Sequence, residues 1–115
     1  MKIKIKRVYE GFDIKDGRRV LVDRLWSRGL KKEAARIDLW MKEIAPSDEL
    51  RNWFAHDPAK WNDFKKKYFA ELKSNLKLCE ELIGKEKGTL TLLYSSKNIE
   101  HNQAVALKEF LEKYF

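Results

Sequence analysis

The chain has few of the residues that build covalent cross-links and metal centres. Its 115 residues include one cysteine, two histidines and two prolines. A single cysteine, Cys79, excludes an internal disulfide and a zinc site made from cysteines. Two histidines far apart in the sequence provide no recognisable ligand spacing. We therefore expect a reducing compartment, no cofactor and no resident metal. The one metal alternative that stays open is a divalent ion held by Asp23, His101 and a phosphate together.

Long apolar runs are missing as well. No window approaches the roughly 20 apolar residues of a transmembrane helix. The first ten residues, MKIKIKRVYE, contain no apolar stretch of signal-peptide length. The sequence thus predicts a cytoplasmic protein with no membrane partner. Gly/Ser linkers, repeats and low-complexity tracts are also lacking, so we expect residues 1–115 to form a single domain.

Charge is abundant and unevenly placed. The formal net charge is +7, and residues 1–36 hold 12 Lys and Arg against 5 Asp and Glu, whereas the remainder is balanced. Arg18, Arg19, Arg24 and Arg28 lie in this basic third. An excess of this kind favours an anion-attracting face for phosphates or nucleic acid, although solubility alone would also explain it. No helix-turn-helix, zinc-finger or RNA-recognition pattern accompanies the charge.

Three segments are predicted to be strands. Ile3, Ile5 and Val8 alternate loosely with lysines, which is typical of a strand near a sheet edge. Turn residues between Gly11 and Gly17 lead to a buried strand at 19–23, and TLTLLY at 89–94 is the strongest strand pattern in the chain.

Helices are predicted between the second and third strands and at the end of the chain. From Lys32 the apolar spacing changes to Ile37, Trp40, Met41 and Ile44, which indicates an amphipathic helix that stops before Pro46. Ser47 is expected to cap the next, short helix, and Asp57 with Pro58 to begin a long one ending at Gly84. That long helix should bury its apolar positions, Trp61, Phe64, Tyr68, Leu72, Leu76, Cys79 and Ile83.

The order of these elements predicts the fold class. A long helical crossover into 89–94 requires a parallel partner in the same sheet. We expect a small α/β domain with a parallel or mixed sheet of about three strands, flanked by four to five helices.

The stretch RVLVDRLWSRGL, which ends at Leu30, is the first candidate site. A buried strand feeds directly into Asp23, Arg24, Trp26 and Arg28. Guanidinium groups match the geometry of carboxylates and phosphates, and ligands in α/β proteins bind at strand ends. Arg24 and Arg28 would hold an anion, Trp26 would stack on a ring of the ligand, and Asp23 would move protons. The alternative is an ion pair between Asp23 and Arg24 or Arg28 that ties the strand to its loop.

The second candidate site follows the strand at 89–94. A strand-to-helix loop offers free backbone N–H groups that bind anions, with Lys97 adding a point charge. Ser96, Asn98 and Asn102 are equally well explained as capping residues. His101 near a ligand could serve as general acid or base, although a surface or capping role is common for histidine. The proposed members of this site are Tyr94 and His101 as catalytic residues, and Ser95, Ser96, Lys97 and Asn102 as ligand-binding residues.

His56 and Asp57 form a smaller, ambiguous pair. The carboxylate could orient the imidazole, but Asp57 is well explained as the cap of the helix that begins at Pro58. His56 is left between a functional role and a hydrogen bond to a buried carbonyl.

The pieces RVLVDRLWSRGL, DLWMKEIAPSDELRNWFAHDPAKWNDFKKKY and TLLYSSKNIEHNQAVAL together resemble the domain of unknown function 488 family, in its short YeaO-like branch. The resemblance covers nearly the whole chain and implies a small bacterial or archaeal cytosolic α/β protein. Other branches are distantly similar to rhodanese-type domains, with an Asp-containing strand end like LVDRLW and another strand that ends in a cysteine before a Cys-His-Arg motif. Here Tyr94 stands at the strand end, and His101, Asn102 and Gln103 replace that motif, so persulfide transfer is not expected.

Two functions follow as hypotheses. The first is a pocket at the carboxyl ends of the strands that binds, and could turn over, a small phosphate- or nucleotide-like anion. The second is a non-catalytic module that contacts nucleic acid or an acidic partner through the basic N-terminal third. The sequence leaves the oligomeric state open.

Overall fold

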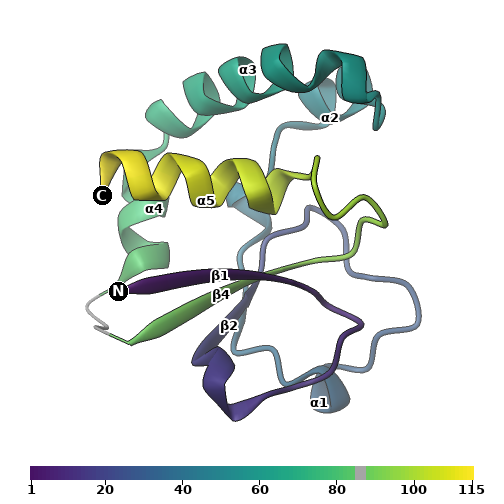
Figure 1. The fold of residues 1–115 in the computed structure, drawn as a ribbon, viewed down its shortest axis with the longest axis vertical. Helices are drawn as coiled ribbons and strands as arrows, with labels where there is room; N and C mark the ends of the chain where they lie inside the picture. Colours follow the sequence, from purple (N-terminus) through teal and green to yellow (C-terminus); the bar gives the residue numbers. More distant parts are fainter. Residues whose placement is uncertain (85–87) are drawn as a thin grey trace.

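The computed structural model describes residues 1–84 and 88–115, and these residues form an α/β fold around a parallel sheet (Figure 1). The described residues contain four strands in the spatial order β1-β4-β2-β3, and every neighbouring pair is parallel. Their bounds are β1 (Lys2–Arg7), β2 (Arg18–Leu21), β3 (Leu39–Trp40) and β4 (Thr89–Tyr94). The predicted α/β class is confirmed, with β3 as one strand more than expected.

Strand β4 lies between β1 and β2. It pairs with β1 along all six of its residues and with β2 along four. Five of its six side chains are buried, as expected for a strand covered on both faces. The parallel partner demanded by the long crossover is therefore present on both sides of 89–94.

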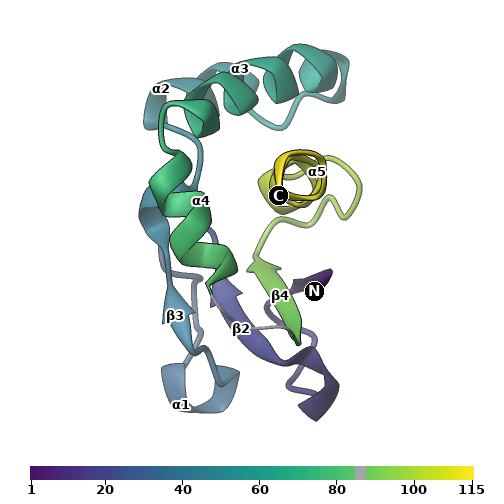
Figure 2. The same cartoon turned by 90° about the vertical axis from the view of Figure 1, so that its left-hand side faces the viewer.

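Most of the helices form layers on one face of the sheet (Figures 1 and 2). The described residues contain α1 (Lys32–Ala35), α2 (Asp48–Phe54), α3 (Trp61–Lys73), α4 (Leu76–Ile83) and α5 (Gln103–Tyr114). Helix α5 packs on β1 and β4, and α3 packs on α5 from outside (Figures 1 and 2). No helix among the residues described is both long and apolar enough to cross a membrane.

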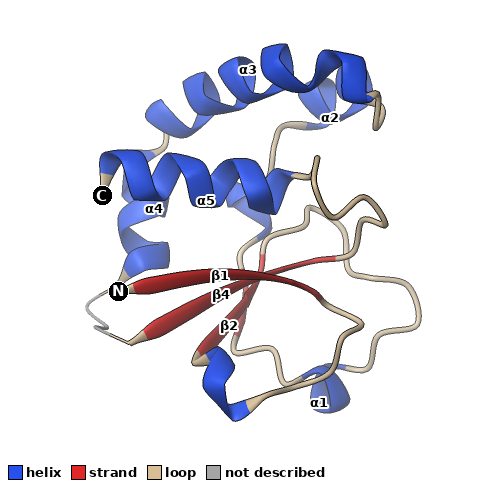
Figure 3. Ribbon diagram, in the orientation of Figure 1, coloured by secondary structure: helices blue, strands red, loops and turns tan. Residues whose placement is uncertain are grey.

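Side-chain alternation along β4 divides the core into two unequal parts. Leu90 and Leu92 face the helices and join the larger apolar cluster with Phe64 and Phe110. Leu93 faces the other way, into a smaller cluster. On that second face lie α1 and loops, as the blue and tan segments below the sheet in Figure 3 show.

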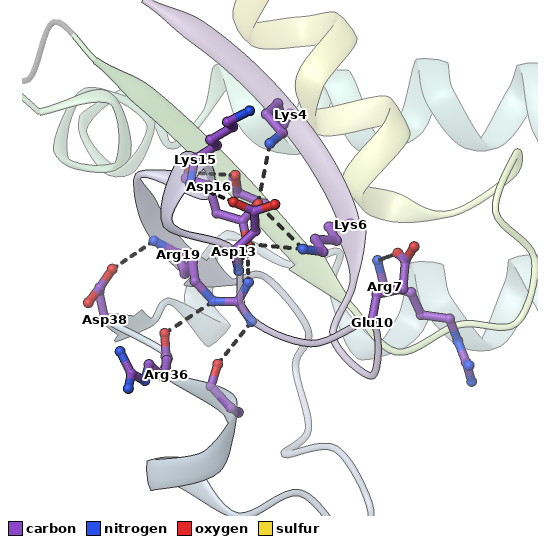
Figure 4. Close-up of polar contacts among 12 residues, drawn as sticks. Lys4, Lys6, Arg7, Glu10, Asp13, Lys15, Asp16, Arg19, Arg36 and Asp38 are labelled. Carbon is purple, nitrogen blue, oxygen red and sulfur yellow. Dashed lines mark hydrogen bonds and ion pairs between the residues drawn. The ribbon is translucent and has the colours of Figure 1, made fainter.

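A cluster of charges covers the amino-terminal half of this second face (Figure 4). Asp16 is fully buried and accepts hydrogen bonds from Lys4 (3.3 Å), Lys6 (3.1 Å) and Arg19. Arg19 is itself only 1% exposed and donates to the Ala35 carbonyl at 2.9 Å. The lysine-covered face predicted for the first strand thus serves as one half of an internal ion-pair network.

This network corrects the expected anion-attracting face. Arg18 and Arg19 lie at the amino end of β2, away from Arg24 and Arg28. The Arg18 guanidinium donates to the Leu82 carbonyl at 2.9 Å, and Arg19 is buried against Asp16. These two arginines therefore stabilise the fold and do not join the other two at one surface.

The amphipathic helix predicted from Lys32 to Pro46 is wrong. Helix α1 ends at Ala35, Arg36 takes a left-handed conformation (φ 50°), and residues 39–40 pair with β2 as strand β3. A 3-10 turn at Lys42–Ile44 follows. The apolar spacing fitted a helix, but the open edge of β2 offered backbone partners, and tertiary pairing overrode the local pattern.

The long helix predicted after Pro58 is interrupted. A 3-10 turn at Pro58–Lys60 leads into α3, and the chain leaves helical geometry at Asn75 (φ −131°, ψ 39°) before α4. The Asn75 side chain donates to the Glu71 carbonyl at 3.2 Å, a local bond that competes with the helical pattern. Because of this break, Leu76 is 44% exposed and does not join the predicted buried stripe.

Predicted helix boundaries were more accurate than helix interiors. Ser47 caps α2 by accepting from the Leu50 N–H, and Asp57 caps the turn at Pro58 by accepting from the Ala59 N–H. Gly84 follows the last residue of α4 with φ 63°. These caps are determined by side chains within one turn of the helix end, which is why the sequence alone predicts them.

Candidate functional site

The two predicted site segments meet at one edge of the sheet. Since β2 and β4 are parallel neighbours, the loops that follow them leave from the same end. A cleft of about 670 Å³ lies between these loops and the α2–α3 region, within the usual range for small-molecule sites. Its lining includes nine of the ten predicted site residues: Asp23, Arg24, Trp26, Arg28, Ser95, Ser96, Lys97, His101 and Asn102.

Asp23 ties the two loops together. Its carboxylate accepts from the Ser95 N–H (2.9 Å), from the Ser95 hydroxyl (2.7 Å) and from the Gln103 amide. Burial raises the pKa of Asp23, against the lowering effect of these hydrogen bonds. No ion pair joins Asp23 to Arg24 or Arg28 within the described residues, so the ion-pair alternative is wrong. The carboxylate acts here as an acceptor for neutral donors from the opposite loop.

Arg24 reaches across the cleft to the segment before α2. One terminal nitrogen, Nη2, donates to the carbonyls of Ala45 and Pro46, both at 3.1 Å. Its Nε atom is buried and has no hydrogen-bond partner in the part of the chain that the structure describes. The hydroxyl of Ser27, another residue of the cleft lining, is likewise buried and has no hydrogen-bond partner among the described residues. Buried polar groups without a hydrogen-bond partner are costly in a folded protein, and both of these belong to residues that line the cleft.

The remaining charges of the cleft are mostly positive. Arg28, Arg51 and Lys97 are exposed and line it together with Arg24, and Asp23 is the one carboxylate in the described lining. Arg51 also pairs with Asp48 at 3.3 Å, but both groups are well exposed, so this pair restrains it little. The cleft therefore presents a positive field with its single negative group already hydrogen-bonded.

Trp26 is held by the protein itself. Its indole nitrogen donates to the Leu30 carbonyl at 2.9 Å, and its ring meets Trp40 edge-on at 5.3 Å. It lines the cleft and also a second cavity, of about 480 Å³, beside β3. The geometry leaves part of the ring facing the cleft, so the stacking role stays a prediction.

The loop after β4 is shaped by its own side chains. Asn98 accepts from the N–H groups of Glu100 (3.0 Å) and His101 (2.9 Å), and Ser96 accepts from the Asn98 N–H. Asn102 caps α5 by accepting from the Val105 N–H at 3.0 Å. The capping alternative is thus correct for Asn102, whereas Ser96 and Asn98 bond N–H groups of the loop itself; all three also line the cleft.

Both histidines of the chain face this cleft. His101 lies 5.0 Å from the Trp61 ring, and His56 lies 6.5 Å from the Phe54 ring, measured between ring centroids. Each comes from a segment next to a helix end, His101 before α5 and His56 after α2. The structure thus places His101 in the lining of the cleft, where a general acid or base would have to lie. It places His56 in the same lining.

Tyr94 is the one predicted site residue that the structure does not bring to the cleft. It is 3% exposed, belongs to the larger apolar cluster and is absent from the cleft lining. Burial raises the pKa of its hydroxyl. A ligand in the cleft would not contact this side chain.

Three polar residues of the cleft were not assigned to the site from the sequence. Gln103 is the first residue of α5, Arg51 lies on the outer face of α2, and Ser27 lies within the first candidate loop. Gln103 directly follows the capping residue Asn102, so its side chain can reach back toward the preceding loop. This position in the sequence could have indicated that Gln103 belongs to the site. Arg51 carried no local signal, because its approach depends on how α2 docks.

The lone cysteine lies away from the candidate site. Cys79 is fully buried in α4, outside the cleft lining, and burial raises the pKa of its thiol to about 11. A reactive thiolate is not formed in such surroundings. Within residues 1–84 and 88–115, no group of three or more His, Cys, Asp or Glu is placed to hold a metal ion.

Fold and site together define a small parallel α/β protein with a cationic cleft at the carboxyl ends of its central strands. The chain belongs to the family described as the Inactive DUF488-N3 subclade, whose model matches residues 2–115. This confirms the resemblance drawn from the three sequence pieces.

Similar proteins come from several bacteria. The chain is 44% identical to the uncharacterised protein YeaO of Escherichia coli (strain K12) over 112 residues, which cover 96% of this chain and 97% of that one. It is 36% identical to the uncharacterised protein Rv3073c of Mycobacterium tuberculosis (strain ATCC 25618 / H37Rv), over 96% and 93% of the two chains. No solved structure matches the chain.

Proposed function

We propose that the chain is a cytoplasmic protein that binds a small phosphate- or nucleotide-like anion in the cleft, without covalent turnover. The observation that carries this proposal is the convergence of Arg24, Arg28 and Lys97 from two separate loops on one concave site. Guanidinium and ammonium groups are the side chains that bind phosphate in proteins. The only carboxylate of the described lining, Asp23, accepts hydrogen bonds from Ser95 and Gln103 and is outnumbered by the cations of the cleft.

Two features favour binding over catalysis. The family description names an inactive subclade. The acid–base candidates also differ in what they touch: His101 lines the cleft, whereas Asp23 is saturated with hydrogen bonds and Tyr94 is buried in the core. With the thiol of Cys79 remote as well, the residues at hand suit recognition better than bond breaking.

The alternative hypothesis uses the basic N-terminal third as a diffuse surface for nucleic acid or an acidic partner. Several of its cations are engaged inside the fold, since Lys4, Lys6 and Arg19 all pair with Asp16. This reduces the charge available to a partner, and the cleft is the better-supported site.

The experiment is a thermal-shift and calorimetric titration of the full chain with inorganic phosphate, nucleotides, polyphosphate and short nucleic acids at two salt concentrations. A ligand of the folded state raises the apparent stability, and a diffuse charge surface loses its ligand steeply with salt. We expect a small-anion shift that survives the higher salt and is reduced at least tenfold in affinity by Arg24→Gln.

Arg24 also donates hydrogen bonds to the Ala45 and Pro46 carbonyls, so Arg24→Gln removes contacts within the fold as well as contacts with a ligand. A second variant therefore tests binding without this structural change. Lys97 is exposed, and Lys97→Gln should weaken binding without changing the melting temperature of the free protein. The matched control removes three exposed lysines of the basic third outside the cleft, by Lys2→Gln, Lys15→Gln and Lys31→Gln. If this control abolishes binding while the cleft variants preserve it, the proposal is wrong and the surface alternative is right.

A further inference from the structure

The cleft has two walls of different chemistry. Its cations come from the loops after β2 and β4 and from α2, whereas rings gather where α2 meets α3. Phe54 and Phe64 line this side, stacked at 4.3 Å between centroids. His56 and His101 extend the same wall at its two ends. A bare phosphate would use the first wall and leave the second without a partner.

The rings of this wall form one connected set. Trp61 links its parts, at 5.7 Å from Phe64, 6.1 Å from Phe54 and 5.0 Å from His101. Phe54 and Phe64 are buried and rigidly packed, so they supply an apolar floor that needs no rearrangement. The more exposed histidine rings supply edges and faces that a flat ligand ring can contact.

The backbone at His56 is held in an uncommon conformation. Ala55 and His56 both have positive φ, 45° and 57°, although neither is glycine. Ala55 is explained by the end of α2, because its N–H closes the helix onto the Arg51 carbonyl at 3.0 Å. His56 follows it as the second central residue of a turn that the Asp57 N–H closes onto the Phe54 carbonyl at 2.9 Å. A left-handed residue with a β-carbon costs free energy, and such residues gather at binding sites.

The volume of the cleft agrees with a ligand larger than phosphate. About 670 Å³ exceeds what a single tetrahedral anion fills and lies in the range of sites for drug-sized molecules. Aromatic side chains also bind nucleobases by stacking with little regard to sequence, because every base has a π face.

Building on the proposed function, we infer that the ligand is a phosphate joined to a flat ring, with the size and chemistry of a nucleoside 5′-monophosphate. Its phosphate lies against Arg24 and Lys97. Its ring lies against the wall of Phe54, His56 and His101. The positive wall gives affinity for the anion, and the ring wall selects among anions.

The test compares affinities of the full chain, by calorimetry at fixed ionic strength, for inorganic phosphate, ribose 5-phosphate and the 5′-monophosphates of adenosine, guanosine, cytidine and uridine. We expect at least one nucleoside monophosphate to bind tenfold or more tightly than ribose 5-phosphate. Equal affinities for all three kinds of ligand would overturn the inference and leave the proposed function standing. No binding of any phosphate at millimolar concentration would overturn both.

The variant His56→Asn tests whether the wall of Phe54, His56 and His101 contacts the ring of the ligand. Asparagine tolerates a positive φ, so the variant keeps the backbone and removes the ring. We expect it to reduce the preference for the nucleoside monophosphate over ribose 5-phosphate at least threefold. The matched control is Ala55→Gly, which relieves the neighbouring left-handed residue and removes no ring, and should keep the preference. A preference unchanged in His56→Asn would overturn the assignment of this wall.

Discussion

Asp16 and Asp23 are both buried carboxylates, and their surroundings are opposite. Three cations surround Asp16: burial raises its pKa, but hydrogen bonds from Lys6, the Asp13 N–H, Lys4 and Arg19 outweigh burial and lower the pKa to about 2. Asp23 meets only neutral donors, and burial raises its pKa. Burial alone therefore does not decide the charge state of a carboxylate, since the charge of its partners does.

The same contrast separates a structural end of the sheet from an open one. The Asp16 network fills the amino half of one face with paired charges and leaves little room. The carboxyl end, where Asp23 lies, has a cleft whose cations Arg28 and Lys97 form no ion pair among the described residues. Matched substitutions at the two ends of the sheet test this contrast between a structural end and an open end.

The largest effect is expected from removing the charge of Asp16. Asp16→Asn leaves the buried Arg19 guanidinium without its counter-charge, which should lower the free energy of unfolding by on the order of 3–5 kcal/mol. The matched change Asp23→Asn loses hydrogen bonds to neutral groups only, at about 1–2 kcal/mol. Urea unfolding at neutral pH measures the free energy of unfolding of both variants. Equal losses in the two variants would contradict the contrast between the two carboxylates.

Glycines at the two ends should also differ. Gly17 follows Asp16 with φ 64°, and an added β-carbon would lie 2.2 Å from the Thr89 carbonyl oxygen. Gly17→Ala should therefore cost roughly 2–4 kcal/mol, from the clash and the left-handed backbone together. Gly29, near the cleft, has φ 74° with open space around it, so Gly29→Ala should cost about 1 kcal/mol. Unfolding midpoints of the two variants check the difference.

The pH dependence of stability should show both carboxylates with opposite signs. A pKa lowered from 3.8 to about 2 means that Asp16 contributes roughly 2 kcal/mol above pH 4, lost as the pH falls through 2. The raised pKa of Asp23 means that the fold prefers its protonated form, so this contribution declines as the pH rises above 3.8.

Two variants separate these contributions. Asp16→Asn should flatten the acid limb of the curve, and Asp23→Asn should remove the decline above pH 3.8. Melting temperatures between pH 2 and 7 provide the measurement. An acid limb that persists unchanged in Asp16→Asn would show that other carboxylates control acid unfolding.

The smallest effect is expected at the hydrogen bonds of Asp23. Ser95→Ala removes the 2.7 Å bond from the hydroxyl while the backbone N–H and Gln103 continue to donate, so the loss should be about 1 kcal/mol. Ser96→Ala is the matched control, because its hydroxyl accepts one longer bond, 3.2 Å, from Asn98. Chemical unfolding of both variants should rank Ser95→Ala as the more destabilised.

Sequence reasoning succeeded where local rules decide the structure. The strand at 89–94, the caps at Ser47, Asp57 and Asn102, and the meeting of two strand-end loops all follow from short-range patterns and from parallel pairing. The interpretation of 37–44 as a helix failed because the free edge of β2, a feature created elsewhere in the chain, determined that segment.

The site shows the same limit. Arg24 and Lys97 could be predicted because they follow strands, and strand ends converge in this class of fold. Arg51 and the ring wall could not, since they depend on how α2 and α3 dock above the sheet. The network around Asp16 was missed for a similar reason: nothing local links the lysines of β1 to a turn ten or more residues later.

The position of β4 also has a consequence for how the chain folds during synthesis. Strands β1 and β2 do not touch, because β4, encoded at residues 89–94, lies between them. When only the first 80 residues have left the ribosome, β1 has no strand to pair with. The surface of β1 and β4 on which α5 later packs does not yet exist. Contacts of long sequence separation close late and slowly. The central strand can therefore insert only after residues 89–94 have left the ribosome, and until then β1 and the free edge of β2 are exposed to other proteins and to chaperones.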